Sequence, residues 1–145
     1  MDKYAKAVLA VVAPLVFMLL VGCAGSDVRT VSAANSIANG KPSIFVYRER
    51  IIGGMAGRYE VNANGISQRL KIGEIAVLPI IDGANIVFVK PVDINRSQPA
   101  MTQVTSNGKV SKYLVVQQVF NGAELREVPK NEWESLVNAK KLTIF

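Results

Sequence analysis

The sequence predicts a mainly β protein, an antiparallel β-sandwich or small barrel with one helix at its C-terminal end. Three observations favour this fold class. From Ser43 onward, short runs rich in β-branched and aromatic residues are separated by turn residues at close intervals. Asn-Gly or Asp-Gly pairs lie between several of these runs. A single amphipathic pattern follows the last run, which is typical of a helix that covers one end or edge of a sheet.

The strand-forming runs can be followed in order along the chain. The first is "SIFVYRE", which begins at Ser43 after a proline. The pair Asn64-Gly65 predicts a tight hairpin, and the pairs Asp82-Gly83 and Asn107-Gly108 predict two more. Pro79 interrupts an apolar run and therefore indicates an edge strand or a bulge. The segment "NGAELREV" adds a short last strand.

The C-terminal helix is predicted over "PKNEWESLVNAKK", residues 129–141, with Asn131 as its N-cap. Its large apolar side chains share one face at i, i+3 and i+4 spacing: Trp133, Leu136 and Val137. The predicted core draws on this helix and on the strands, and it comprises Phe45, Tyr47, Val61, Val77, Ile86, Phe88, Leu114, Val116 and Trp133.

The N-terminal region has the three-part layout of a secretory signal. Lys3 and Lys6 form a basic start, residues 7–21 carry no charge, and small residues surround Cys23, the only cysteine. The apolar run is shorter than the roughly 20 residues of a membrane-spanning helix, and Pro14 lies in its middle. A cleaved signal peptide is therefore favoured over a retained membrane helix.

The stretch "LVGC" resembles the lipobox of bacterial lipoproteins. The resemblance implies that signal peptidase II recognises Leu20, Val21 and Gly22, and that Cys23 receives a diacylglyceryl group and an amide-linked acyl chain such as palmitate. Ala24 after the cysteine implies sorting to the outer membrane, facing the periplasm. An ordinary buried or free cysteine inside a simple signal peptide is the alternative.

These features divide the chain into three parts. Residues 1–22 are the lipoprotein signal peptide, residues 23–42 are a lipidated tether of small and polar residues, and residues 43–145 are a β-sandwich domain. The chain has 17 Lys and Arg against 11 Asp and Glu, but no basic cluster with interleaved aromatics. We therefore expect no nucleic-acid partner.

Several motifs resemble a family of uncharacterised bacterial envelope lipoproteins that carry a single β-sandwich domain behind a lipobox. They are "SIFVYRE", "YEVNANG", "LKIGEIAVLPI", "DGANIVFV" and "GKVSKYLVV", and they fall within residues 42–136. Two positions depart from the family pattern: Asp82-Gly83 replaces a Pro-Gly turn, and Asn85 stands where histidine is common. The resemblance implies a fold and an envelope location, but no catalytic residue.

Composition excludes several kinds of chemistry. The chain has no histidine, so a Ser-His-Asp triad, a Cys-His pair and an imidazole metal ligand are absent, and it has no nucleotide-binding glycine motif. The acidic residues show no spacing that pairs two carboxylates for general acid-base catalysis. We predict a protein that is not an enzyme, with no cofactor and no metal.

One segment stands out as a contact surface for a partner or an anionic membrane. "RERIIGGMAGR" combines apolar residues, glycines and flanking arginines on one loop. The candidate contact residues are Arg48, Arg50, Ile51, Ile52, Met55 and Arg58. The alternative is that Ile51 and Ile52 finish the strand and the glycines form a loop over the end of the sandwich.

The sequence thus favours a membrane-anchored envelope lipoprotein that acts as a non-catalytic binding or structural module. Its partners would be the membrane, through the lipid anchor, and an envelope protein. Two other functions stay open at this point. One is an accessory lipoprotein subunit of an envelope assembly such as a secretion or conjugation apparatus, and the other is a small envelope hydrolase.

Overall fold

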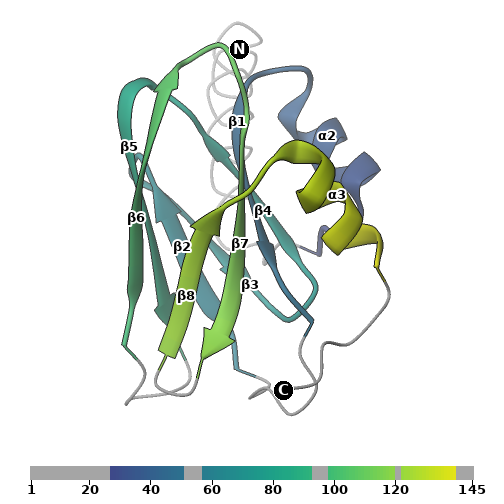
Figure 1. The fold of residues 1–145 in the computed structure, drawn as a ribbon, viewed down its shortest axis with the longest axis vertical. Coiled ribbons are helices and arrows are strands. Elements are labelled where there is room, and N and C mark those ends of the chain that lie inside the picture. Colours follow the sequence, from purple (N-terminus) through teal and green to yellow (C-terminus); the bar gives the residue numbers. More distant parts are fainter. Residues whose placement is uncertain (1–26, 51–56, 93–97, 120–121, 140–145) are drawn as a thin grey trace, which may run out of the picture.

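The computed structural model describes residues 27–50, 57–92, 98–119 and 122–139, and it shows two packed four-stranded sheets with two short helices (Figure 1). The first sheet has the order β4 (Ile75–Pro79), β1 (Ser43–Arg48), β7 (Lys112–Val119), β8 (Gly122–Glu127). The second has the order β3 (Ile66–Leu70), β2 (Tyr59–Ala63), β5 (Asp82–Pro91), β6 (Ala100–Asn107). The helices are α2 (Val31–Ala38) and α3 (Lys130–Asn138). The mainly β, sandwich-like fold with a C-terminal helix is confirmed.

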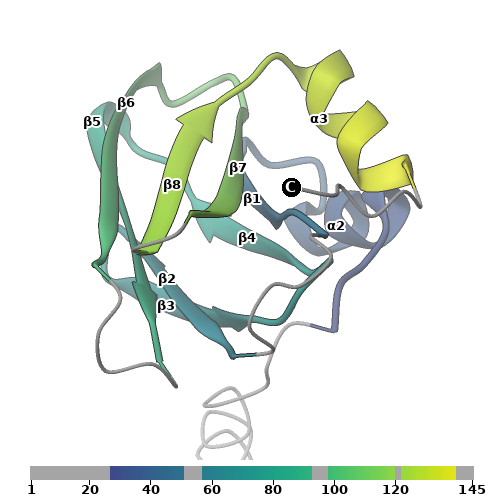
Figure 2. The same ribbon diagram turned by 60° about the horizontal axis from the view of Figure 1, so that its bottom comes forward.

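Strand β1 of the first sheet is buried on both faces. All six residues of β1 are buried, because its inner face packs against the second sheet and its outer face against the helices. On the helix side the rings of Phe45, Tyr113 and Trp133 lie with centroids 5.2–5.7 Å apart. The indole nitrogen of Trp133 donates a hydrogen bond to the carbonyl of Leu114 at 3.2 Å. Figure 2 shows both helices on this side of the molecule, away from the second sheet.

Two local predictions are confirmed with small changes. Asn64 and Gly65 have φ of 50° and 81° and join β2 to β3, with Ala63 paired to Ile66, as a tight turn with two positive φ angles requires. Helix α3 buries Trp133 and Val137, with Leu136 packed beside them. The helix begins at Lys130, so its N-cap is Pro129 rather than Asn131.

The other two predicted hairpins are wrong. Strands β4 and β5 belong to different sheets, and so do β6 and β7, so each connection crosses the sandwich. Asp82 and Gly83 are the first residues of β5, and Gly83 and Gly108 do adopt positive φ, 94° and 70°. The turn residues therefore report local backbone conformation correctly. Strand pairing is decided instead by which apolar faces can be buried together.

The core prediction fails in β5. Ile86 is 54% exposed and Phe88 is half-buried, because the inward residues of this strand are Asn85, Val87 and Val89. Val77 of β4 is half-buried on the helix side. The remaining predicted core residues are buried, namely Phe45, Tyr47, Val61, Leu114, Val116 and Trp133.

The outer edge of β4 is closed by side chains and by the N-terminal segment. The side-chain amide of Gln68 on β3 accepts from the N–H of Val77 at 3.2 Å and donates to its carbonyl at 2.9 Å. The N–H of Ile75 donates to the carbonyl of Val28 at 2.7 Å. Pro79 has no N–H, and β4 is an edge strand, as predicted. The edge therefore offers little template for pairing with another chain.

The segment predicted as a tether is partly folded, which corrects the boundary at residue 42. Helix α2 begins after Thr30, whose side-chain oxygen accepts from the N–H of Ala33 at 3.2 Å. It buries Ala34 and Ala38 against the first sheet, and Val28 packs on the same cluster. Among the described residues no helix is long and apolar enough to cross a bilayer. The signal peptide and Cys23 lie outside the described residues.

Candidate functional site

The candidate site lies at the end of the sandwich where β1 finishes, and a buried arginine forms its interior. Arg48 is 2% exposed. Its Nη1 atom donates to the carbonyls of Gly57 and of Leu70, the latter at 3.1 Å, and its guanidinium carbon lies 4.0 Å from the ring centroid of Tyr59. Burial lowers the pKa of Arg48 below its ordinary range and raises the pKa of Tyr59.

This burial overturns one site prediction. Arg48 was expected on a contact surface, but its side chain is enclosed and holds together the backbone before β2 and at the end of β3. A buried cation persists because backbone carbonyls and an aromatic face replace its lost water. Arg48 is thus a structural residue of this end of the sandwich.

A buried glutamate beside it fastens the N-terminal segment. Glu74 is 2% exposed, and its Oε2 atom accepts from the backbone N–H of Lys71 at 2.8 Å. Its Oε1 atom accepts from Arg29 at 3.2 Å, and the carbonyl of Val28 accepts from the N–H of Ile75. Val28 and Arg29 are thus fixed to the sandwich, and Val28 lies five residue steps after Cys23 in the sequence.

Of the other predicted contact residues, the structure describes Arg50 and Arg58, and these two differ in exposure. Arg50 is half-buried, and it packs so closely on Gly73 that a Cβ atom there would lie 2.6 Å from the Nε atom of Arg50. Arg58 is exposed immediately before β2. The remaining three, Ile51, Ile52 and Met55, lie outside the described residues, as do the lipobox residues Leu20, Val21, Gly22 and Cys23.

The outer surface of the β3-β2-β5-β6 sheet, which we call the open face, is the feature that the sequence prediction missed. Its apolar part consists of Ile86, Phe88 and Met101. Phe88 and Met101 lie opposite each other in β5 and β6, and Met101 is 69% exposed. The pattern "AMTQVTSN" in β6 alternates, and it contained the signal that Met101 and Val104 face opposite sides.

The basic part of the open face lies beside this apolar part, toward the Arg48 end. Glu60 on β2 is paired with Arg69 on β3 and with Lys90 on β5. Because successive side chains of a strand alternate between faces, Glu60, Arg69 and Lys90 project on the outer side. Tyr59 and Leu70 form the next pair of β2 and β3, and they point inward. The residues that follow them toward this end of the sandwich, Arg58 and Lys71, are exposed next to the ends of β2 and β3, at the margin of this face. The region carries a clear positive excess.

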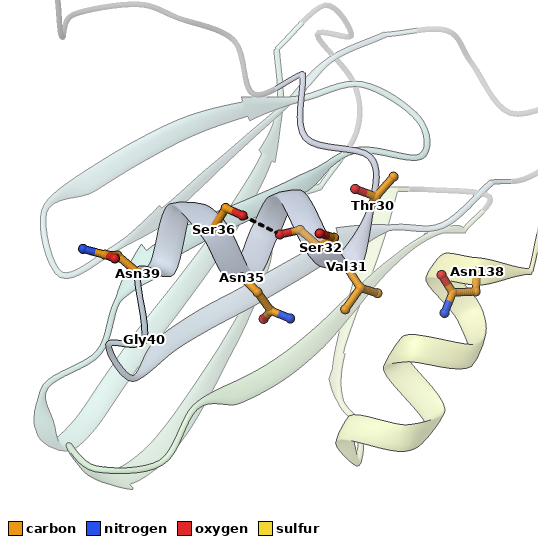
Figure 3. A pocket seen from close by; sticks show the side chains of 8 residues that line it. All are labelled: Thr30, Val31, Ser32, Asn35, Ser36, Asn39, Gly40 and Asn138. Atoms are coloured by element: carbon orange, nitrogen blue, oxygen red, sulfur yellow. Dashed lines mark hydrogen bonds between the residues drawn. The ribbon is translucent and has the colours of Figure 1, made fainter.

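A hollow of about 760 Å³ lies between α2 and α3. Figure 3 shows its lining, which is neutral and mostly hydroxyl and amide: Thr30, Val31, Ser32, Asn35, Ser36, Asn39, Gly40 and Asn138. Several of these groups have structural roles. Thr30 caps α2, Asn39 ends it in the left-handed conformation, and the hydroxyl of Ser36 donates to the carbonyl of Ser32 at 3.0 Å. Among the described residues that line it, none has a charged side chain or an aromatic ring.

Catalytic and metal-binding groupings are sparse in the described part of the chain. Glu74 is the only buried carboxylate there, and no cluster of three or more potential metal ligands of the His, Cys, Asp and Glu types occurs. Every buried side-chain nitrogen and oxygen of these residues has a hydrogen-bond partner. Comparisons with protein-family models, with curated proteins and with solved structures gave no match.

Proposed function

We propose that this chain is an envelope lipoprotein, anchored through acylated Cys23 to the outer membrane facing the periplasm, and that it acts as a non-catalytic binding or structural module. The observation that carries the proposal is the "LVGC" stretch, which follows a basic start and an uncharged apolar run. Several acyl chains on one residue give a stable anchor, since each buried methylene contributes about 0.8 kcal/mol.

The short distance in sequence between Cys23 and the fastened residue Val28 supports this anchoring. Val28 and Arg29 are fixed to the sandwich through Ile75 and Glu74. Five residue steps separate Cys23 from Val28, and fully extended chain covers at most about 3.5 Å per residue. An anchor at Cys23 would therefore keep the domain within roughly 17 Å of its attachment point.

The polar side chains that could take part in catalysis already form hydrogen bonds or ion pairs, which supports a non-catalytic role. Both carboxylate oxygens of Glu74 already accept hydrogen bonds. Ser111 and Lys112, neighbours in sequence and the residue types of a Ser-Lys dyad, are also engaged in other contacts. The hydroxyl of Ser111 accepts from the N–H of Ser43 at 3.1 Å, and Lys112 forms an ion pair with Glu127 at 2.8 Å. A nucleophile needs a base within hydrogen-bond reach, and these contacts direct both groups elsewhere.

The anchor is tested by replacing the acceptor sulfur. In cells fed labelled palmitate, the Cys23→Ser chain is expected to remain unlabelled and to accumulate at precursor size. Ser26→Ala, three residues further on, is the matched control and is expected to be labelled and processed normally. If Cys23→Ser is still labelled and processed like the control, the lipoprotein assignment is wrong.

A second experiment separates a module that acts alone from a subunit of an assembly. The lipidated protein is extracted in mild detergent and its mass is measured by light scattering with size-exclusion chromatography. A monomer supports the proposed binding or structural module. A stable stoichiometric complex with other envelope proteins would favour an accessory subunit of a secretion or conjugation apparatus instead.

A further inference from the structure

We propose that the open face of the second sheet lies against the anionic bilayer to which Cys23 is attached, so that the protein has a second, reversible membrane contact. This inference rests on the proposed lipid anchor and specifies which surface of the domain meets the membrane.

Large apolar side chains are exposed on one face of the second sheet. Met101 is 69% exposed and Ile86 is 54% exposed, and Phe88 lies between the inward residues Val87 and Val89 and therefore points outward. Phe88 and Met101 are directly paired across β5 and β6, so the three side chains lie within neighbouring positions of the sheet. Helices cover the first sheet, whereas the described helices leave this face exposed (Figure 2).

The basic residues beside the apolar patch complement the negative charge of an anionic bilayer. Lys90 lies two residues from Phe88 along β5, a step of about 7 Å, and Glu60 pairs with both Lys90 and Arg69. Arg58 and Lys71 extend this basic region by one more position. Four basic residues against one acidic residue beside an apolar patch fit a surface of anionic headgroups over acyl chains.

The short chain between Cys23 and the domain keeps one end of the sandwich near the bilayer. The N-terminal segment is fastened at Ile75 and Glu74, at the end of the sandwich where Lys71 and Arg58 also lie. A tether of at most roughly 17 Å from Cys23 keeps this end close to the lipid surface. Docking is then an intramolecular event at high effective concentration, so a small patch is enough to be occupied. This favours the bilayer over a protein, which would have to be recruited from solution.

The test measures the depth of one side chain in lipidated protein reconstituted into vesicles that contain phosphatidylglycerol. Acylation blocks Cys23, so Met101→Cys offers a single thiol for an environment-sensitive dye, and Ile37→Cys on α2 is the control with 55% exposure on the helix side. Quenching by a lipid-borne spin label is expected at position 101 and not at position 37.

Charge dependence gives a second readout. The Arg69→Gln, Lys90→Gln double variant is expected to dock about thirty-fold more weakly, which corresponds to about 2 kcal/mol at 1.4 kcal/mol per tenfold. The control double variant, Lys41→Gln with Lys109→Gln, removes the same charge from exposed positions outside this face and is expected to dock normally. High salt should reduce quenching at position 101.

Each other outcome contradicts the inference in a distinguishable way. If the protein is lipidated and vesicle-bound but position 101 is quenched no more than position 37, the face does not meet the bilayer, although the proposed function stands. If the protein is neither acylated nor vesicle-bound, the proposed function fails and the inference with it. Disulfide crosslinks between undyed Met101→Cys chains would show that a second copy covers the face. Protection of position 101 only in native membranes would indicate a protein partner.

Discussion

Replacing Arg48 by methionine tests whether this arginine is part of the domain's framework. The substitution keeps most of the side-chain volume but removes the donors to the carbonyls of Gly57 and Leu70 and the contact with Tyr59. An orphaned buried carbonyl costs about 1–3 kcal/mol, and a cation–π contact contributes about 0.5–2 kcal/mol. Methionine also removes the penalty of burying a charge, which offsets part of this loss. We expect a net destabilisation of about 3 kcal/mol.

The assay is urea unfolding of the soluble chain that begins at residue 23 and carries Cys23→Ser, followed by circular dichroism. With a slope of about 1.5 kcal/mol per molar urea, the midpoint of Arg48→Met should fall by about 2 M. Arg69→Met is the matched control, because Arg69 is exposed on the open face, and its free energy of unfolding should change by no more than about 0.5 kcal/mol. Equal midpoints for the two variants would refute the structural role of Arg48.

Three further predictions concern other parts of the molecule. Gln68→Ala removes the amide that closes the β4 edge, so we expect the free energy of unfolding to fall by about 1–2 kcal/mol and aggregation measured by light scattering to be faster. Gln103→Ala, at an exposed position, is the control, and equal aggregation of the two variants would contradict the edge-closing role. Asn85→Ala removes a buried amide that bonds both backbone groups of Ile81 and the buried carbonyl of Val104, so urea unfolding should show a loss of about 3 kcal/mol. A loss under about 1 kcal/mol would contradict this role of Asn85. Burial raises the pKa values of Tyr47 and Tyr59 above their ordinary value near 10, so the stability that they contribute is present below about pH 10 and is lost as pH rises through the raised values. The tyrosinate absorbance of these residues should therefore appear together with unfolding. Its appearance in fully folded protein at the ordinary pKa would contradict the burial.

Sequence patterns predicted the fold class because they depend on local chemistry that the structure keeps. Asn64-Gly65 forms its hairpin, and Trp133 and Val137 bury the predicted face of α3. Asp82-Gly83 did not form a hairpin, because a positive φ at Gly83 is compatible with a strand that enters the other sheet. The residues of a turn specify backbone angles, but the partner of a strand depends on distant contacts.

The candidate site was harder to predict for two physical reasons. The run "IVFV" in β5 is apolar at four consecutive positions, so alternation within it could not decide whether Ile86 or Val87 faces the core. Arg48 looked like a surface residue because its acceptors, the carbonyls of Gly57 and Leu70, come from segments that only the fold brings together. Burial of a charge depends on such partners and has no local sequence signal.

The N-terminal helix was missed although its signals were present. Thr30 is a suitable N-cap and Asn39-Gly40 a suitable stop, and the structure uses both. The helix has only eight residues and buries two alanines, so its composition resembles a linker. Isolated helices of this length are unstable, and this one persists through packing on the first sheet.

The most direct test of the central claim is the mass of the N-terminal peptide of the protein purified from membranes. We expect the peptide to begin at Cys23 and to carry a diacylglyceryl group and one amide-linked acyl chain. A chain that begins elsewhere, or a Cys23 that remains a free thiol on membrane-extracted protein, would contradict it.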